Sequence, residues 1–140
     1  MKSPLSRKTE LLRAARAAMK HAYAPYSNFR VGAAILLRDG RIFCGCNVEN
    51  ASYGLTICAE RNAIFAAVAQ SPRPPEIVAV AVVNHRGVPC SPCGACRQVM
   101  AEFGREAVVW YLGEKGIVQR TMQELLVDGF ILCPNKPDKC

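Results

Sequence analysis

The sequence predicts a three-layer α/β/α sandwich around a mixed five-stranded sheet. Helical and strand patterns follow one another in the order helix, strand, strand, helix, strand, helix, strand, strand, helix. Residues 76–83 are a continuous β-rich apolar run, which is typical of a strand buried on both faces. Asp39-Gly40 is a hairpin signal between two strand patterns, so antiparallel pairs are expected beside parallel ones. We expect the two βαβ crossovers to be right-handed and to start their helices at the carboxyl ends of neighbouring strands.

Length and composition favour a single domain over 1–140, with 132–140 as a frayed tail. Apolar residues make up 51% of the chain and charged residues 21%, and no apolar run reaches the roughly 18 residues of a membrane span. Residues 1–8 are charged and lack the apolar centre of a signal peptide, so we expect a cytoplasmic protein with no membrane partner. The formal charge of +7 is scattered along the chain, which argues against a nucleic-acid partner.

The first three elements are a helix and a hairpin. Residues 9–21 carry a single apolar stripe at helical spacing and predict a packing helix. A turn-rich loop over 23–29 leads into a strand over 30–37, and the turn at Asp39-Gly40 returns the chain as a strand over 41–48. Alternation along that second strand sends Asn47 and Glu49 to one side and Val48 to the other.

The middle of the chain alternates helices and buried strands. A helix over 58–69 has small alanines that allow it to lie close to a sheet, and the proline-rich residues 71–75 end it. The central strand over 76–83 follows, and a second helix ends near Gly104.

The last elements complete the sheet. Residues 107–112 predict a buried strand, and 117–120 predict a short edge strand. Thr121 and Glu124 have the spacing of a capping box, so a short helix is expected through Val127.

Two short cysteine stretches indicate one split metal site. Cys93 and Cys96 are three residues apart at a helix start, where both sulfurs can reach one ion, and Cys58 stands at another helix start. Three protein ligands leave a fourth position for water, as in catalytic zinc sites. Glu60 would then serve that water. Because zinc with three thiolates carries a net charge of minus one, we expect the Arg61 guanidinium to bond the ligand sulfurs and offset this charge.

Other uses of the cysteines and histidines stay open at this point. Cys44 and Cys46 could join Cys93 and Cys96 in a closed structural zinc site, and Cys90, Cys93 and Cys96 have a spacing found in iron–sulfur ligation. Both arrangements leave Glu60 without a role. The remaining thiols are most simply incidental, and we interpret two histidines as structural rather than as bases or ligands: His21 and His85.

Three motifs give the chain a resemblance to a known family. They are Asn47-Val48-Glu49-Asn50-Ala51-Ser52-Tyr53, Cys58-Ala59-Glu60-Arg61, and Ser91-Pro92-Cys93-Gly94-Ala95-Cys96-Arg97-Gln98-Val99. Zinc nucleobase deaminases have an acidic residue two positions after the first ligand and a Pro-Cys-x-x-Cys second half. From about Ala22 to Phe130 the sequence resembles the small, three-cysteine type of cytidine deaminase.

The resemblance implies an activity, a cofactor and site residues. It implies one Zn²⁺ per subunit and hydrolytic deamination of cytidine and 2'-deoxycytidine to uridine and 2'-deoxyuridine in pyrimidine salvage. Zinc would make hydroxide available for attack at C4, and Glu60 would move the protons. The substrate, a small pyrimidine nucleoside, would meet four residues: Asn47 and Glu49 at the ribose hydroxyls, Phe29 against the ring, and the backbone of Ala59.

The resemblance also implies a homotetramer. Two aromatic residues, Tyr53 and Phe130, are candidates for contact with a neighbouring subunit's pocket. Val127 stands where the family often has a proline, so the course of the chain to Phe130 departs from the family pattern.

Three alternatives to this function remain. They are a deaminase of another cytosine compound such as an aminoacylnucleoside antibiotic, an RNA-editing deaminase, and a zinc module that binds nucleic acid without catalysis. Asn47 and Glu49 argue against the first alternative. Adenosine-specific RNA deaminases typically have histidine as first ligand, where this chain has Cys58.

Overall fold

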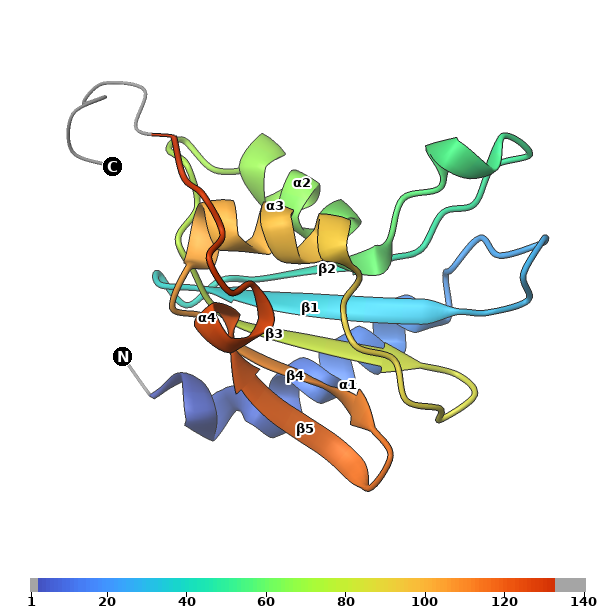
Figure 1. Cartoon of the computed structure of the whole chain (residues 1–140), viewed down its shortest axis with the longest axis horizontal. Coiled ribbons are helices and arrows are strands. Elements are labelled where there is room, and N and C mark those ends of the chain that lie inside the picture. Colours follow the sequence, from blue (N-terminus) through green and yellow to red (C-terminus); the bar gives the residue numbers. More distant parts are fainter. Residues whose placement is uncertain (1–2, 133–140) are drawn as a thin grey trace.

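A mixed sheet forms the middle layer of the computed structural model, which describes residues 3–132 (Figure 1). Its five strands lie in the order β2-β1-β3-β4-β5. The strands are β1 (Val31–Leu37), β2 (Ile42–Cys46), β3 (Ile77–Asn84), β4 (Val108–Gly113) and β5 (Gly116–Thr121). The helices are α1 (Lys8–Met19), α2 (Ala59–Ala69), α3 (Gly94–Gly104) and α4 (Met122–Leu125), with 3-10 turns η1 (Pro4–Arg7) and η2 (Tyr53–Leu55).

The strand pairings confirm a mixed sheet and correct one expectation about it. β1 pairs antiparallel with β2 and with β3, β3 pairs parallel with β4, and β4 pairs antiparallel with β5. The crossover helices α2 and α3 therefore follow strands that are not neighbours, because β1 lies between β2 and β3. The hairpin occupies one edge of β1 and leaves its other edge for β3. The start of β1 lies beside the ends of both strands, with Gly32 opposite Cys46 and Val31 opposite Asn84.

Side chains of alternating residues on β1 build two cores, one on each face of the sheet. Ala33, Ile35 and Leu37 pack with α2, α3 and α4, while Ala34 and Leu36 pack with α1. Figure 1 shows α2 and α3 on one side of the sheet and α1 on the other. The predicted three-layer sandwich is confirmed, since continuous apolar strands need cover on both faces.

Two glycines allow the helices to lie directly on the sheet. A Cβ built on Gly32 would stand 2.0 Å from the carbonyl oxygen of Ala15 in α1. A Cβ on Gly45 would stand 2.4 Å from the amide nitrogen of Ala63 in α2. Real Cβ atoms do not approach backbone this closely, so both positions require glycine for packing.

Several element ends differ from the sequence-based expectation. β2 stops at Cys46 rather than Val48, and α4 stops at Leu125 rather than Val127. The turn η1 was not predicted. The expected tail lies outside the described residues from Cys133 onward. Within 3–132, none of the helices is both long enough and apolar enough to cross a membrane.

Candidate metal centre and active site

The first turns of two helices present the three cysteines that the sequence singles out. Cys58 is the N-cap of α2 and Cys93 is the N-cap of α3, and both have extended backbone. Cys96 lies one turn into α3, so its thiol projects from the same helix start as that of Cys93. Unpaired N–H groups and the helix dipole favour negative charge at these positions. Metal ions bind the thiolate form of cysteine, so a metal at this point would be held by side chains placed at the positive ends of two helices.

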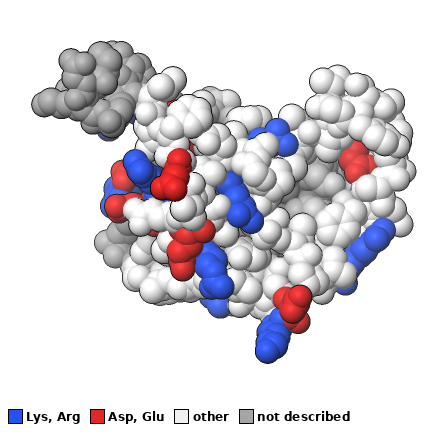
Figure 2. Space-filling view, in the orientation of Figure 1, with Lys and Arg blue, Asp and Glu red and all other residues white. Residues whose placement is uncertain are grey.

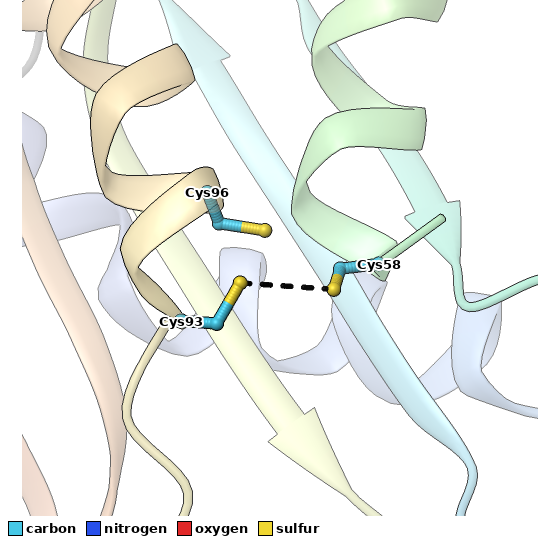
Figure 3. Close-up of side chains that lie close together, drawn as sticks. All are labelled: Cys58, Cys93 and Cys96. Atoms are coloured by element: carbon cyan, nitrogen blue, oxygen red, sulfur yellow. Dashed lines mark hydrogen bonds between the residues drawn. The ribbon is translucent and has the colours of Figure 1, made fainter. Parts of the chain in front are cut away.

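The three sulfur atoms converge on one point between the helices (Figure 3). Their Sγ atoms all lie within 4.8 Å of one another, and those of Cys58 and Cys93 are 3.9 Å apart. A tetrahedral zinc ion with Zn–S bonds of about 2.3 Å separates its sulfurs by about 3.8 Å. The donor set and its spacing thus fit a zinc ion with three thiolate ligands.

Arg61 lies against this cluster, as its place one turn after Cys58 predicts. Its Nη2 donates to the Cys58 sulfur at 3.4 Å. A hydrogen bond from Cys96 and the positive charge of Arg61 lower the pKa of the Cys58 thiol. The Arg61 Nε is buried and has no partner among residues 3–132. A guanidinium with an unused donor beside the sulfurs can stabilise the negative charge that thiolate ligands would carry.

Glu60 lies in the first turn of α2, and its side chain is buried. The residue is only 4% exposed, and this burial is the main reason that its pKa rises to about 7. The negative charge of Cys58 adds to the rise, whereas hydrogen bonding to Cys96 opposes it. A carboxyl group with a pKa near neutrality can both accept and donate a proton under physiological conditions.

Hydrogen bonds from one side chain and from the backbone hold the start of α2 against the end of β2. Asn62 Nδ2 donates to the Cys46 carbonyl at 2.8 Å, and Val48 and Ile57 exchange two backbone hydrogen bonds at 3.0 Å. The loop between β2 and α2 is thereby closed immediately before Cys58. Sequence reasoning gave Asn62 no role, because its partner is a carbonyl whose position depends on the fold.

Asn47 is buried and anchors the loop that precedes β1. Its Oδ1 accepts from the Val31 amide at 2.8 Å, and its Nδ2 donates to the Phe29 carbonyl at 2.8 Å. These bonds give Asn47 a positioning role that the expected ribose contact did not include. One N–H and one oxygen lone pair of the amide remain for a ligand.

Glu49 also bonds to this loop, through its carboxylate. The Tyr26 and Ser27 amides donate to its Oε1 at 2.9 and 3.1 Å, and the Ser27 hydroxyl donates to its Oε2. Hydrogen bonds from the Ser27 side chain and backbone lower the pKa of Glu49, which keeps it ionised. A hollow of about 430 Å³ opens beside it, lined by Tyr26, Ser27, Glu49, Tyr53 and Thr56.

Side chains of the turn after β3 form hydrogen bonds with the same loop and pack near the Phe29 ring. The Arg86 guanidinium lies 5.6 Å from the Phe29 ring centroid and donates to the Asn28 carbonyl at 3.0 Å. His85 Nδ1 accepts from the Arg30 amide at 3.0 Å, and its ring lies 6.1 Å from that of Phe29. This contact agrees with our interpretation of His85 as structural.

The other predicted contacts divide between core and surface. Ala59 is fully buried at the start of α2. Tyr53 is 74% exposed and Phe130 is 70% exposed. The Tyr53 ring lies 5.9 Å from the Tyr26 ring, and most of the surface of both Tyr53 and Phe130 is open to solvent.

The alternative with four cysteine ligands is wrong. Cys44 pairs with Ala34 and Cys46 with Gly32, which places both thiols on the α1 side of the sheet, opposite the cluster. Cys90 pairs with Leu112 instead of joining the cluster. Within residues 3–132, the only group of three or more potential ligands at metal-binding spacing is Cys58, Cys93 and Cys96. Two further cysteines lie outside the described residues: Cys133 and Cys140.

Comparisons with known proteins agree with this geometry. Residues 5–112 match the family model of the cytidine and deoxycytidylate deaminase zinc-binding region. A cytidine deaminase of Halalkalibacterium halodurans is 50% identical over 122 residues, which cover 86% of this chain and 91% of that protein.

Two crystal structures are also similar. One is a cytidine deaminase from Burkholderia pseudomallei, with a TM-score of 0.80 and 51% identity over 87% of this chain and 98% of that one. The other is a cytidine deaminase from Mycobacterium tuberculosis, with a TM-score of 0.79 and 41% identity over 89% of this chain and 98% of that one. Fold, cysteine cluster and sequence similarity lead to one conclusion: the chain belongs to the cytidine and deoxycytidylate deaminase family.

Proposed function

We propose that the chain catalyses hydrolytic deamination of cytidine and 2'-deoxycytidine to uridine and 2'-deoxyuridine, with release of ammonia, in pyrimidine salvage. The observation that carries the proposal is the cluster of three thiols with a buried carboxyl group, Glu60, at its edge. The named activity of the similar proteins supports the same reaction.

Cys58, Cys93 and Cys96 would hold one zinc ion per subunit. When bound, zinc supplies a Lewis acid that lowers the pKa of a water molecule toward about 7. Arg61 donates to the Cys58 sulfur and so offsets the negative charge of the three thiolates.

Glu60 is the residue to which we assign the proton transfers. Its carboxylate accepts a proton from the attacking water and delivers protons to the ring nitrogen and to the departing amine. Water adds at C4, the C4–N4 bond breaks, and ammonia leaves. The burial that raises the Glu60 pKa makes one carboxyl group suitable for both directions of transfer.

The loop before β1 would receive the nucleoside. Asn47 and Glu49 offer an amide and a carboxylate to the ribose hydroxyls, and the half-buried Phe29 offers a ring face to the pyrimidine. Backbone groups near Ala59 and Ser91 would orient the base. The bonds of Asn47 and Glu49 to residues 26–31 support this assignment, because they hold the loop in one conformation before substrate arrives.

We further propose that the protein is a homotetramer of single-domain chains in the cytoplasm and that it does not bind nucleic acid. The exposure of Tyr53 and Phe130 supports contacts between subunits. In the view of Figure 2, lysine and arginine lie among acidic residues rather than in a continuous stripe. On this face, the described residues form no basic patch of the kind that nucleic acid requires.

The test is ultraviolet absorbance of cytidine, deoxycytidine and free cytosine, each incubated with zinc-loaded protein. Loss of the cytosine absorbance from both nucleosides, but not from the free base, is the expected result, because the ribose contacts contribute to binding. No change with any of the three would refute the proposal. Activity on an aminoacylated cytosine nucleoside or on RNA, with neither nucleoside altered, would replace it with one of those substrates.

A further inference from the structure

Arg97 follows Cys96 on α3, and its guanidinium forms hydrogen bonds in two directions. Its Nε donates to the Pro92 carbonyl at 2.7 Å, and its Nη2 donates to the Ser91 hydroxyl at 3.1 Å. Its Nη1 donates to the Leu125 carbonyl at 2.9 Å. One side chain therefore joins two segments that are about 30 residues apart in the sequence.

On one side, Arg97 holds the residues that present Cys93. Pro92 is fully buried and directly precedes this cysteine, and its carbonyl accepts the shortest of the three bonds. The backbone at Pro92 and the helix start at Cys93 set where the Cys93 sulfur lies relative to that of Cys58. Loss of the Arg97 bond to Pro92 would leave the position of the Cys93 sulfur less well defined, although all three thiols would still be present.

On the other side, Arg97 caps the last turn of α4. This helix has only four residues, so most of its carbonyls have no partner within the helix. A guanidinium at Leu125 satisfies one of them and complements the negative end of the helix dipole. The next amide, that of Leu126, donates to the Met122 carbonyl at 2.9 Å. Beyond it the chain continues to the exposed Phe130.

We propose that Arg97 is a positioning residue that couples the metal-holding loop, 91–93, to α4. A change that destabilises either segment then destabilises the other. The inference rests on the proposed zinc site and extends it to the segment that carries Phe130. Arginine suits this role because its planar fork donates in several fixed directions, whereas lysine is a single flexible point charge. No part of Arg97 contacts a ligand sulfur in this assignment.

The test is a double-mutant cycle of Arg97→Gln and Thr121→Ala on zinc-loaded protein. Thr121→Ala removes the N-terminal cap of α4 at the end of the helix away from Arg97. Two quantities are measured in each variant: the rate of zinc release to a chelator and the hydrogen-exchange rate of the Leu126 amide. Arg13→Gln, an exposed arginine on α1 at the other face of the sheet, is the matched control.

Coupling predicts that Arg97→Gln raises both rates, with zinc released about 10-fold faster, the lower end of the effect expected for residues that orient metal ligands. Thr121→Ala alone also speeds zinc release, but it adds nothing to that rate once Arg97 is replaced. Arg13→Gln leaves both rates unchanged. Cobalt-substituted Arg97→Gln shows an altered thiolate charge-transfer spectrum, which a general loss of stability would not produce.

The coupling would be overturned if Thr121→Ala changed the zinc-release rate by the same factor in the presence and in the absence of Arg97. It would also be overturned if Arg97→Gln changed only one of the two rates, zinc release or Leu126 hydrogen exchange. A wild-type protein that retains no zinc would refute the proposed function instead. The same cycle on zinc-free protein, with the alkylation rate of Cys93 in place of zinc release, tests the coupling independently. Non-additive rates would support it there, and additive rates would overturn it.

Discussion

Glu60 is nearly inaccessible to solvent, although carboxyl groups are rarely buried without a partner. Its neighbours are the thiols of Cys58 and Cys96, and their negative charge when ionised makes the site costly for a second anion. Burial of a carboxylate beside these thiols is unfavourable, which supports the proton-transfer role that we propose for Glu60. The spacing of Glu60 from Cys58 led to this role in the sequence analysis, and the role stays a prediction.

Replacement of Glu60 by glutamine tests that role. Glu60→Gln keeps the size and one oxygen acceptor but cannot carry a proton. We expect it to retain zinc and to lose at least about 10²- to 10⁴-fold in turnover, the range attributed to acid–base catalysis. Metal content and turnover are measured on the same sample, and wild-type turnover at full zinc occupancy would contradict the assignment.

The cysteine cluster was predictable because each of its two parts lies at a helix start. Cys93 and Cys96 share a helix start, and Cys58 has an equivalent position in α2. The contacts of Asn62 and Arg97 were not predictable. Both side chains bond to carbonyl groups of other segments, and no pattern along the chain reveals which carbonyls the fold brings near.

At the scale of elements, the seating of α2 on β2 decides where Cys58 lies. Gly45 allows this contact, because a Cβ there would stand 2.4 Å from the Ala63 nitrogen and 2.5 Å from the Ala59 carbonyl oxygen. We expect Gly45→Ala to push α2 away and to lower the free energy of unfolding by about 1–3 kcal/mol, as overpacking does. Zinc occupancy should fall with it.

The control for this change is Gly54→Ala, since a Cβ on Gly54 meets nothing within 4 Å. Chemical denaturation and metal analysis of both variants give the comparison. Equal stability and equal zinc content in the two would show that α2 does not depend on the close approach at Gly45.

The capping box of α4 gives the chain a pH-dependent stability. The Thr121 amide donates to Glu124 Oε2 at 2.6 Å, and this backbone bond is the main reason that the Glu124 pKa is lowered. A lowered folded-state pKa stabilises the protein above the unfolded pKa, near 4.3 for glutamate, and this contribution is lost as pH falls through the folded value.

Glu124→Ala should therefore lower the melting temperature at pH 7 and make progressively less difference below about pH 4. Thermal unfolding of both proteins across the acid range provides the measurement. A melting-temperature difference that stays constant from pH 7 to the acid limit would exclude ionised Glu124 as the cause. The sequence was sufficient to predict the box, because its two residues are only three positions apart in the chain.

Strand order shows why other features of the fold could not be derived. Both crossover helices were expected after neighbouring strands, yet β1 lies between β2 and β3. The hairpin signal fixes which strand follows β1 but not which strand takes its other edge. The cluster still forms because α2 and α3 start at the same end of the sheet (Figure 1).

At the scale of the whole molecule, the open question is what covers the exposed aromatic residues. The resemblance implies four subunits but does not define their surface of contact, and both Tyr53 and Phe130 are largely exposed in the single chain. The tetramer and the single-domain organisation accordingly stay predictions. We expect light scattering to give four times the chain mass of 15.3 kDa.

In such a tetramer, Phe130 would contribute to a pocket on a neighbouring subunit. Phe130→Ala should raise KM for cytidine by about 2- to 10-fold, the worth of one aromatic pair, with zinc content unchanged. Leu132→Ala is the control, because Leu132 is equally exposed in the same segment. The same KM in both variants and in the wild type would remove Phe130 from the pocket.

The central claim is that three cysteines hold a zinc ion with one position left for water. X-ray absorption at the zinc edge of the purified protein tests it most directly. We predict three sulfur neighbours at about 2.3 Å and one oxygen neighbour at about 2.0–2.2 Å. Four sulfur neighbours would instead indicate a closed structural site, in which Glu60 has no water to serve, and would contradict the account.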